Sequence, residues 1–208
     1  RRAAPYLLRQ TRWDDASRLL EHMFVRDSSP ATLAFALPLL RRIAEATAGT
    51  ERGLIDASVL ASALRLAGRT GEAEQMLRDV IARCAAQGNF RLASPVASQL
   101  LNLLMAGGRL TEALTVADEM AGYTRQAKLG PWSQLADEGQ PLQVLNALGR
   151  YDEVLAAVEK LRPQLDSLPE KSEADETANP WNVREGLLDT GRSAAMRSER
   201  WEAALELN

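Results

Sequence analysis

The sequence predicts an all-α fold made of consecutive antiparallel helical hairpins. A short turn pattern recurs along the chain, in which an arginine is followed by an acidic residue and then by alanine or valine. The segments on either side of this turn carry apolar residues three and four positions apart, which is the period of an α-helix. Alternating polar and apolar runs bounded by Asn-Gly or Asp-Gly, which would indicate β-hairpins, are absent from the sequence.

Five copies of the turn can be aligned. They read RWDDA at 12–16, RTGEA at 69–73, RLTEA at 109–113, RYDEV at 150–154 and RWEAA at 200–204. The central copies are 40 and 41 residues apart, whereas the outer spacings of 57 and 50 residues require insertions. A regular spacing of this size indicates an internal repeat of one supersecondary unit.

Each central turn has the same local chemistry. A glycine ends the first helix, because glycine enters the left-handed conformation at little cost. Acidic residues follow in the first turn of the second helix, where the helix dipole favours carboxylates. The glycines are Gly68, Gly108 and Gly149, and the acidic residues are Glu72, Glu112, Asp152 and Glu153.

The turns divide the chain into five expected hairpins within a single helical repeat domain. They cover about 1–27, 52–87, 90–128, 131–166 and 180–208. One extra helix is expected at about 30–48, with Ser29 as its N-cap, Pro30 at its first position and Pro38 as a possible kink.

Two segments interrupt the pattern. Gly139 and Pro141 are expected to delay or kink the first helix of the fourth hairpin. Residues 166–180 are polar and acidic without an apolar stripe, so they predict a loop. This loop is either a solvated connection or a segment that contacts a partner.

Composition excludes several classes of protein. A net charge of −3 and a pI near 5.4 argue against nucleic-acid binding by this chain. No apolar run is long enough for a transmembrane helix. Cys84 is the only cysteine, so an intrachain disulfide is impossible and a cytoplasmic location is expected. The chain begins without Met and ends partway through a repeat, so we expect a fragment of a larger protein.

No arrangement of residues in the sequence indicates catalysis. His22 is the only histidine and Cys84 is expected to be a small core residue, so a zinc site of the usual type cannot be assembled. A Ser-His-Asp triad is not credible around His22, and the glycine-rich phosphate motifs are absent. We therefore expect no enzyme activity, no metal and no cofactor.

The hairpins resemble the tetratricopeptide repeat (TPR) superfamily. That family places a glycine at the inter-helix turn, then a large residue, an acidic residue and a small residue. Gly149, Tyr151, Glu153 and Val154 match these places, and Gly108 begins a second match with Leu110, Glu112 and Ala113. The period of about 40 residues exceeds the usual 34 of the family and is similar to repeat regions of large bacterial regulators.

The resemblance implies a right-handed superhelix, an α-solenoid, whose concave face is lined by the first helix of each hairpin. It implies that a partner peptide contacts this face. Asn102 and Asn146 would bind its backbone, and Arg65 would bind a carboxylate. The implied partner-binding residues are Ser58, Ser62, Arg65, Gln99, Asn102, Met105, Gln143 and Asn146, flanked by Ile55, Val59, Ser98 and Gln140.

Three functions remain open from the sequence. The first is a module that binds a protein or peptide partner, as the scaffold or sensor part of a larger bacterial regulator. The second is a structural or autoinhibitory repeat that contacts its own chain or a second copy, and so forms a homodimer. The third is binding of a small molecule, which would require a deep apolar pocket with converging polar groups.

Overall fold

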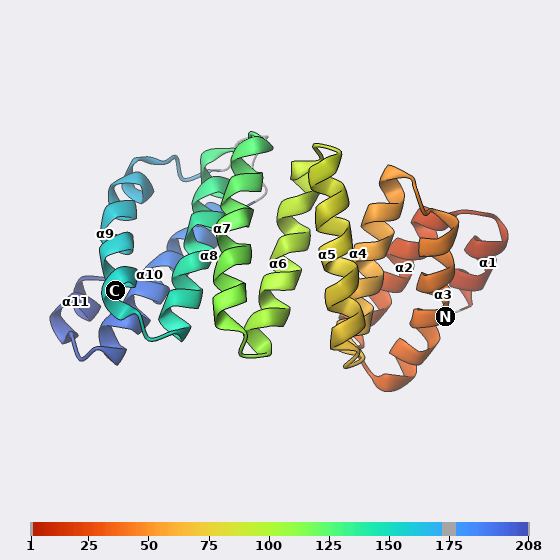
Figure 1. Cartoon of the computed structure of the whole chain (residues 1–208), viewed down its shortest axis with the longest axis horizontal. Coiled ribbons are helices and arrows are strands. Elements are labelled where there is room, and N and C mark those ends of the chain that lie inside the picture. Colours follow the sequence, from red (N-terminus) through yellow and green to blue (C-terminus); the bar gives the residue numbers. More distant parts are fainter. Residues whose placement is uncertain (1, 172–177, 208) are drawn as a thin grey trace. The chain divides into compact units, whose positions relative to one another are not determined.

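The structure is a computed structural model that describes residues 2–171 and 178–207. Within these residues the chain forms eleven α-helices and no β-strand, and consecutive helices run antiparallel (Figure 1). The chain divides into two compact units, Arg1–Leu103 and Leu104–Asn208, and each is described here by itself. No described helix is both long enough and apolar enough to cross a membrane.

The first unit contains two helix pairs, one additional helix between them, and most of a sixth helix after them. Its helices are α1 (Ala3–Arg9), α2 (Trp13–Arg26), α3 (Pro30–Ala46), α4 (Glu51–Leu66), α5 (Thr70–Ala86) and the greater part of α6 (Phe90–Ala106). The pairs are α1 with α2 and α4 with α5, and the additional helix is α3. Ser29 caps it by accepting a hydrogen bond from the Thr32 backbone N–H, and Pro30 is its first residue, as the sequence predicted.

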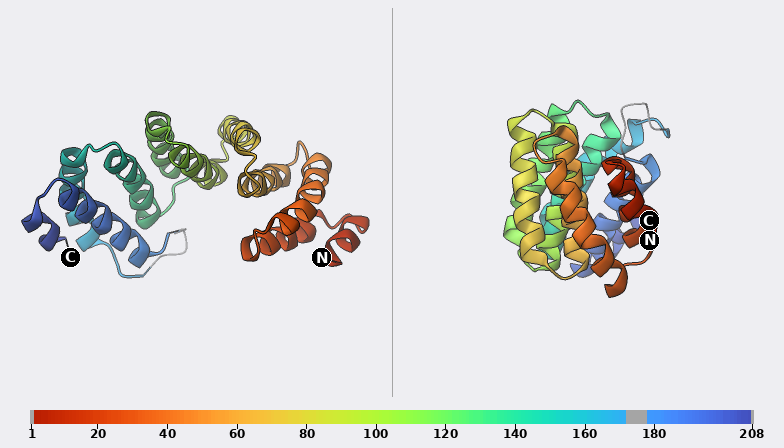
Figure 2. Two further views of the ribbon diagram at one scale, coloured as in Figure 1. Left: turned by 90° about the horizontal axis from the view of Figure 1, so that it is seen from below. Right: turned by 90° about the vertical axis from the view of Figure 1, so that its right-hand side faces the viewer.

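The second unit contains the remaining helices. These are α7 (Leu110–Gln126), α8 (Pro131–Ala147), α9 (Tyr151–Ser167), α10 (Pro180–Arg197) and α11 (Trp201–Glu206). α10 packs against both α8 and α9 (Figure 2). The expected loop at 166–180 overlaps the end of α9 and the start of α10, and its residues 172–177 lie outside the described part of the chain.

The inter-helix turns have the backbone that the glycine pattern predicted. Gly68, Gly108 and Gly149 adopt positive φ angles of 75°, 71° and 77°. The sequence pattern did not reveal that three other turns place a non-glycine residue in the same conformation. These residues are Thr11, Lys128 and Glu199.

The arginine of the repeated turn has a structural role that the sequence reading missed. It occupies the N-cap position of the second helix and forms an ion pair with the acidic residue three positions later. The N–O distances are 2.6 Å for Arg12–Asp15, 2.5 Å for Arg69–Glu72, 2.6 Å for Arg109–Glu112 and 2.6 Å for Arg150–Glu153. Glu153 raises the pKa of Arg150 through this hydrogen bond. Because these pairs are exposed to solvent, each contributes little to stability.

The first helix of the fourth hairpin differs from its prediction in one respect. Gly139 and Pro141 were expected to delay or kink it, but they do not delay it, because α8 is continuous from Pro131 to Ala147 and contains both residues. Tertiary packing provides most helix stability in proteins and so offsets the hydrogen bond that Pro141 cannot donate. Gly139 is buried because α10 lies against it, as described below.

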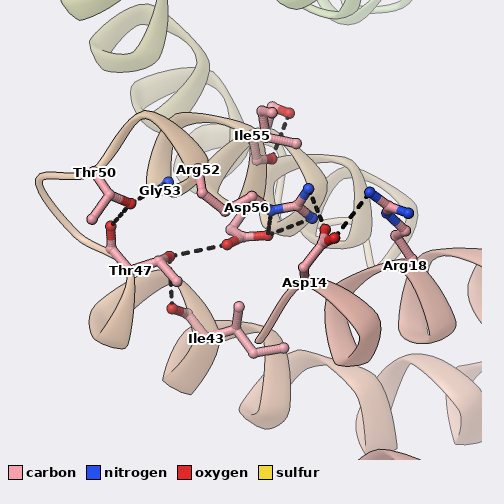
Figure 3. Close-up of polar contacts among 10 residues, drawn as sticks. Asp14, Arg18, Ile43, Thr47, Thr50, Arg52, Gly53, Ile55 and Asp56 are labelled. Atoms are coloured by element: carbon pink, nitrogen blue, oxygen red, sulfur yellow. Dashed lines mark hydrogen bonds and ion pairs between the residues drawn. The ribbon is translucent and has the colours of Figure 1, made fainter. Parts of the chain in front are cut away.

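A buried ionic network fixes the α3–α4 corner to α2 in the first unit (Figure 3). The Asp56 side chain is fully buried, and its Oδ1 accepts hydrogen bonds from Arg52 Nε at 3.2 Å and Nη2 at 3.1 Å. The Thr47 hydroxyl lies 3.0 Å from Asp56 Oδ2. Arg52 also pairs with Asp14 of α2, which pairs with Arg18 at 2.9 Å. A buried carboxylate needs such partners, because an isolated buried charge is strongly destabilising.

The close packing at the same corner explains why residue 53 is a glycine. Thr50 caps α4 by accepting a hydrogen bond from Gly53 N at 3.0 Å. A Cβ atom at Gly53 would lie 2.2 Å from the Thr47 carbonyl oxygen, which is far inside van der Waals contact. Glycine is therefore required where α4 starts against this corner.

The core of each unit is made of aliphatic side chains on the facing sides of the helices. In the first unit Cys84 is fully buried, as predicted, and burial raises the pKa of its thiol. In the second unit the core gathers around Trp132, which is also fully buried. Val154 and Leu165 of α9 and Val183 and Leu187 of α10 belong to the same core.

Candidate functional site

The candidate site is a groove between α8 and α10, the first helices of the last two hairpins. It has a volume of about 330 Å³ and lies entirely within the second unit. This volume lies at the lower end of the range for ligand-binding pockets. The lining residues are Ala136, Gly139, Gln140, Gln143, Ala178, Asn179, Asn182, Val183, Gly186 and Leu187.

Small residues have two effects on the groove. Some leave open space in it, and one lets the two helices that form it pack closely together. A Cβ atom at Gly139 would lie 2.9 Å from Leu187 Cδ2, so the absence of a side chain lets α10 pack closely against α8. A Cβ atom at Gly186 would meet nothing within 4 Å, so this position faces open space. Ala136 and Ala178 add two more small surfaces to the lining.

The polar lining consists of side-chain amides. Gln140 and Gln143 come from α8, and Asn182 comes from the first turn of α10. Within the described residues these three side chains have no hydrogen-bond partner. Each amide offers two donors and one acceptor oxygen, which is the combination that can pair with both the N–H and the C=O of a peptide backbone.

Asn179 lines the same groove but already has a structural role. Its Oδ1 accepts hydrogen bonds from Trp181 N at 3.0 Å and Asn182 N at 3.3 Å, so it is the N-cap of α10. Its amide group remains on the groove lining. The cap fixes the first turn of α10 and so positions Asn182.

One tryptophan holds the groove walls in place. The Trp132 indole N–H donates to the Pro169 carbonyl oxygen at 2.9 Å, which connects α8 to the segment after α9. The Arg184 guanidinium lies 5.6 Å from the centre of the Trp132 ring and donates to the Leu165 carbonyl oxygen at 2.9 Å. These contacts join α8, α9 and α10 to one another, so the groove is largely preformed.

Asn146, which the sequence assigned to partner binding, is tied to the neighbouring helix. Its Nδ2 donates to Ser193 Oγ of α10 at 3.1 Å, while its Oδ1 is buried and has no hydrogen-bond partner among the described residues. Asn146 follows Gln143 by one helical turn, next to the groove. The side chain therefore helps to hold α10 against α8.

The other predicted residues lie on α4 and α6, outside this groove. Ser58 is 6% exposed and its hydroxyl donates to the Ile55 carbonyl oxygen at 2.8 Å, so little of it is accessible. Ser62 donates to Gln99 Oε1 at 2.7 Å, which links α4 to α6. Arg65 and Asn102 are exposed, and Met105 is half-buried. Of the predicted partner-binding residues, only Gln143 lines the groove.

Sequence reasoning missed the contribution of α10. Asn182 and Gly186 were not assigned, because the last hairpin could not be aligned closely with the other copies. A signal was available in the sequence Asn179-Pro180, an N-cap followed by a proline at the first helical position. It locates the start of α10 and therefore the face on which Asn182, Val183 and Gly186 lie.

The described residues show no arrangement suited to metal chemistry. No group of three or more His, Cys, Asp or Glu side chains in this part of the chain could hold a metal ion. No ionisable residue is among the described residues that line the groove. The groove therefore offers hydrogen bonds and shape rather than charge.

The chain has the TPR-like repeat fold. Its structure is similar to the crystal structure of a kinesin light chain-like protein of Podosopora anserina that is built of nearly identical TPR-like repeats. The TM-score is 0.66 at 19% sequence identity, and the match covers 91% of this chain and 92% of that chain. A single-substitution variant of the same protein gives a TM-score of 0.65 at 20% identity with the same coverage.

These comparisons confirm the predicted all-α, TPR-like fold class. No protein-family profile matches the chain, and no curated protein matches it. At this level of identity the structural likeness shows the fold and not the partner.

Proposed function

We propose that this chain is a protein-interaction module that binds an extended, uncharged segment of a partner protein in the groove between α8 and α10. The observation that supports the proposal is the combination of small residues with unpaired amides in one preformed groove. Amides of Gln140, Gln143 and Asn182 can each hydrogen-bond a peptide backbone. The small lining residues Ala136, Ala178 and Gly186 leave room for that backbone to approach.

The size and polarity of the groove favour a short peptide stretch over a cofactor. Its volume of about 330 Å³ is small for a drug-sized organic ligand. Val183 and Leu187 provide apolar contact beside the amides, as expected for a peptide with small side chains. Because no charged side chain is among the described lining residues, the proposed segment is neutral.

The cellular role is part of the same proposal. A scaffold or sensor within a larger bacterial regulator, in the cytoplasm, would be consistent with the repeat period of 40 to 41 residues and the single buried cysteine. These aspects rest on the sequence alone. The identity of the bound segment would identify the process.

The proposal can be tested with peptides selected on the intact chain. Peptides of about twelve residues would be enriched from a random displayed library, and their affinities measured by fluorescence polarisation. Gly186→Leu would place a side chain in the groove, because nothing lies within 4 Å of the Cβ position. We expect it to weaken binding by about tenfold or more, equivalent to about 1.4 kcal/mol.

Gly71→Leu is the matched control. Gly71 is an exposed helical glycine of α5, and a Cβ atom there also meets nothing within 4 Å. Both substitutions should preserve or raise the melting temperature, because leucine is a better helix former than glycine. Equal affinity of the two variants for the selected peptides would contradict the groove as the binding site.

A further inference from the structure

A second surface of the last hairpin is apolar and exposed. Trp181 is 69% exposed, Met196 51%, Trp201 60% and Leu205 75%. All four belong to α10 or α11. Met196, Trp201 and Leu205 lie together around one pocket, whereas Trp181 lies in the first turn of α10. Contiguous apolar side chains on a surface mark sites of association.

The α10 part of this surface follows one helical face. Trp181, Glu185, Leu188, Arg192 and Met196 are spaced by four, three, four and four residues, so they line one side of the helix. We call this stripe, together with Trp201 and Leu205, the outer face. At about 100° per residue, Val183 lies on the opposite side of α10 from this stripe, Gly186 about 120° from it and Asn182 about 80° from it. The outer face and the proposed peptide groove therefore have no residue in common.

The residue types along the stripe are arranged symmetrically about its midpoint. Trp181 and Met196 lie at equal distances on either side of a centre between Leu188 and Asp189, and so do Glu185 and Arg192. If two such helices meet antiparallel at this centre, each tryptophan faces a methionine and each glutamate faces an arginine. Such a surface is complementary to itself, which is the requirement for a two-fold symmetric interface.

The structure also contains a place for the large side chain. A pocket of about 350 Å³ lies on the outer face and is lined by Arg192, Met196, Trp201, Ala204 and Leu205. In the antiparallel arrangement this pocket lies opposite Trp181 of the partner subunit. A tryptophan that enters an apolar pocket is the kind of contact that dominates binding energy at interfaces.

We propose that two copies of this chain associate through their outer faces in an antiparallel, two-fold symmetric dimer. Trp181 of each copy enters the pocket beside Met196 and Trp201 of the other. Glu185 of each copy pairs with Arg192 of the other, whose guanidinium also holds Asp189 of its own helix at 2.5 Å.

Sedimentation velocity over a range of protein concentrations tests the association. The weight-average mass should rise from 22.8 kDa toward twice that value as concentration increases. Trp181→Ala should weaken the dimer by about tenfold or more, as expected for an interface anchor. Val25→Ala is the control, because Val25 is equally exposed at 69% but lies on α2.

A charge swap tests the register. Glu185→Arg alone and Arg192→Glu alone should each weaken association, because each creates two like-charge contacts per dimer. The double variant with both changes should restore it, since the charges again face their opposites across the antiparallel pair. Residues 185 and 192 are two turns apart on one helix, so they do not pair with each other within a single copy, although Asp189 lies within reach of both.

Circular dichroism must show unchanged helicity for each variant. A chain that remains monomeric at every concentration would overturn the proposal, as would a dimer that is indifferent to Trp181→Ala. Loss of association in both single charge variants without rescue in the double variant would exclude the antiparallel register.

Discussion

Gly53 shows how a single position controls the packing of a helix start. Its missing side chain allows α4 to begin directly against the carbonyl of Thr47, where a Cβ atom would approach the oxygen to 2.2 Å. The same corner carries the buried pair of Asp56 and Arg52. Neither the contact nor the pair is visible in the sequence, because both depend on how the α3–α4 connection folds back.

We predict that Gly53→Ala lowers the free energy of unfolding by about 2–3 kcal/mol, because the backbone must shift to relieve the clash. Gly71→Ala is the control, since its Cβ position is open. That change should stabilise the protein by up to about 1 kcal/mol through helix propensity. Urea unfolding monitored by circular dichroism measures both, and equal values for the two variants would refute the steric explanation.

The contribution of Glu72 to the stability of the protein is expected to depend on pH. Its pKa is lowered below the ordinary value of 4.5, chiefly by the hydrogen bond from Arg41 and further by Arg69. A carboxyl whose folded-state pKa is lowered contributes stability above its unfolded-state pKa, and the contribution is lost as pH falls through the folded-state value. Wild type should therefore be more stable than Glu72→Gln at pH 7, and the difference should disappear in acid.

Unfolding curves at several pH values measure this difference. Glu119→Gln, an exposed position on α7, is a suitable control. A stability difference for Glu72→Gln that is constant from neutral pH into acid would show that its ion pairs contribute nothing.

At the scale of the element, the turns are the most predictable part of the molecule. Gly68, Gly108 and Gly149 end their helices as expected, since few other residues adopt a positive φ without strain. Lys128 adopts φ of 52° in the equivalent conformation between α7 and α8 without that advantage. The fold therefore holds Lys128 in a backbone conformation that is unfavourable for lysine.

Replacing Lys128 with glycine should stabilise the protein by about 0.5–1 kcal/mol, because the left-handed conformation costs a residue with a Cβ atom about that much. The reverse change, Gly108→Ala, should destabilise it by about 1 kcal/mol. Thermal unfolding followed by calorimetry measures both changes. Stabilisation by Gly108→Ala would contradict the assignment of that turn.

The site was less predictable than the helices. Apolar periodicity shows which face of a helix is buried, and the resemblance to TPR proteins implied that Gln143 lies on a partner-binding face. Neither could show that Asn146 is held by Ser193, or that Leu187 reaches Gly139, because these contacts depend on the distance between α8 and α10. The contribution of Asn182 and Gly186 was missed because the last hairpin could not be aligned closely with the other copies.

At the scale of the whole molecule, we propose two separate surfaces for two different partners. The groove between α8 and α10 is proposed for a neutral peptide segment, and the outer face of α10 and α11 for a second copy. The two surfaces share α10 but have no residue in common. We expect binding at one to leave the other accessible.

The most direct test of the groove is nuclear magnetic resonance of the ¹⁵N-labelled chain titrated with a selected peptide. The side-chain amide signals of Gln140, Gln143 and Asn182 should shift together with the backbone signal of Gly186, and all four should saturate at one peptide concentration. The amide signals of Gln126 and Gln164, at the ends of α7 and α9, should remain in place. Saturating binding that leaves the three groove amides unchanged would contradict the account.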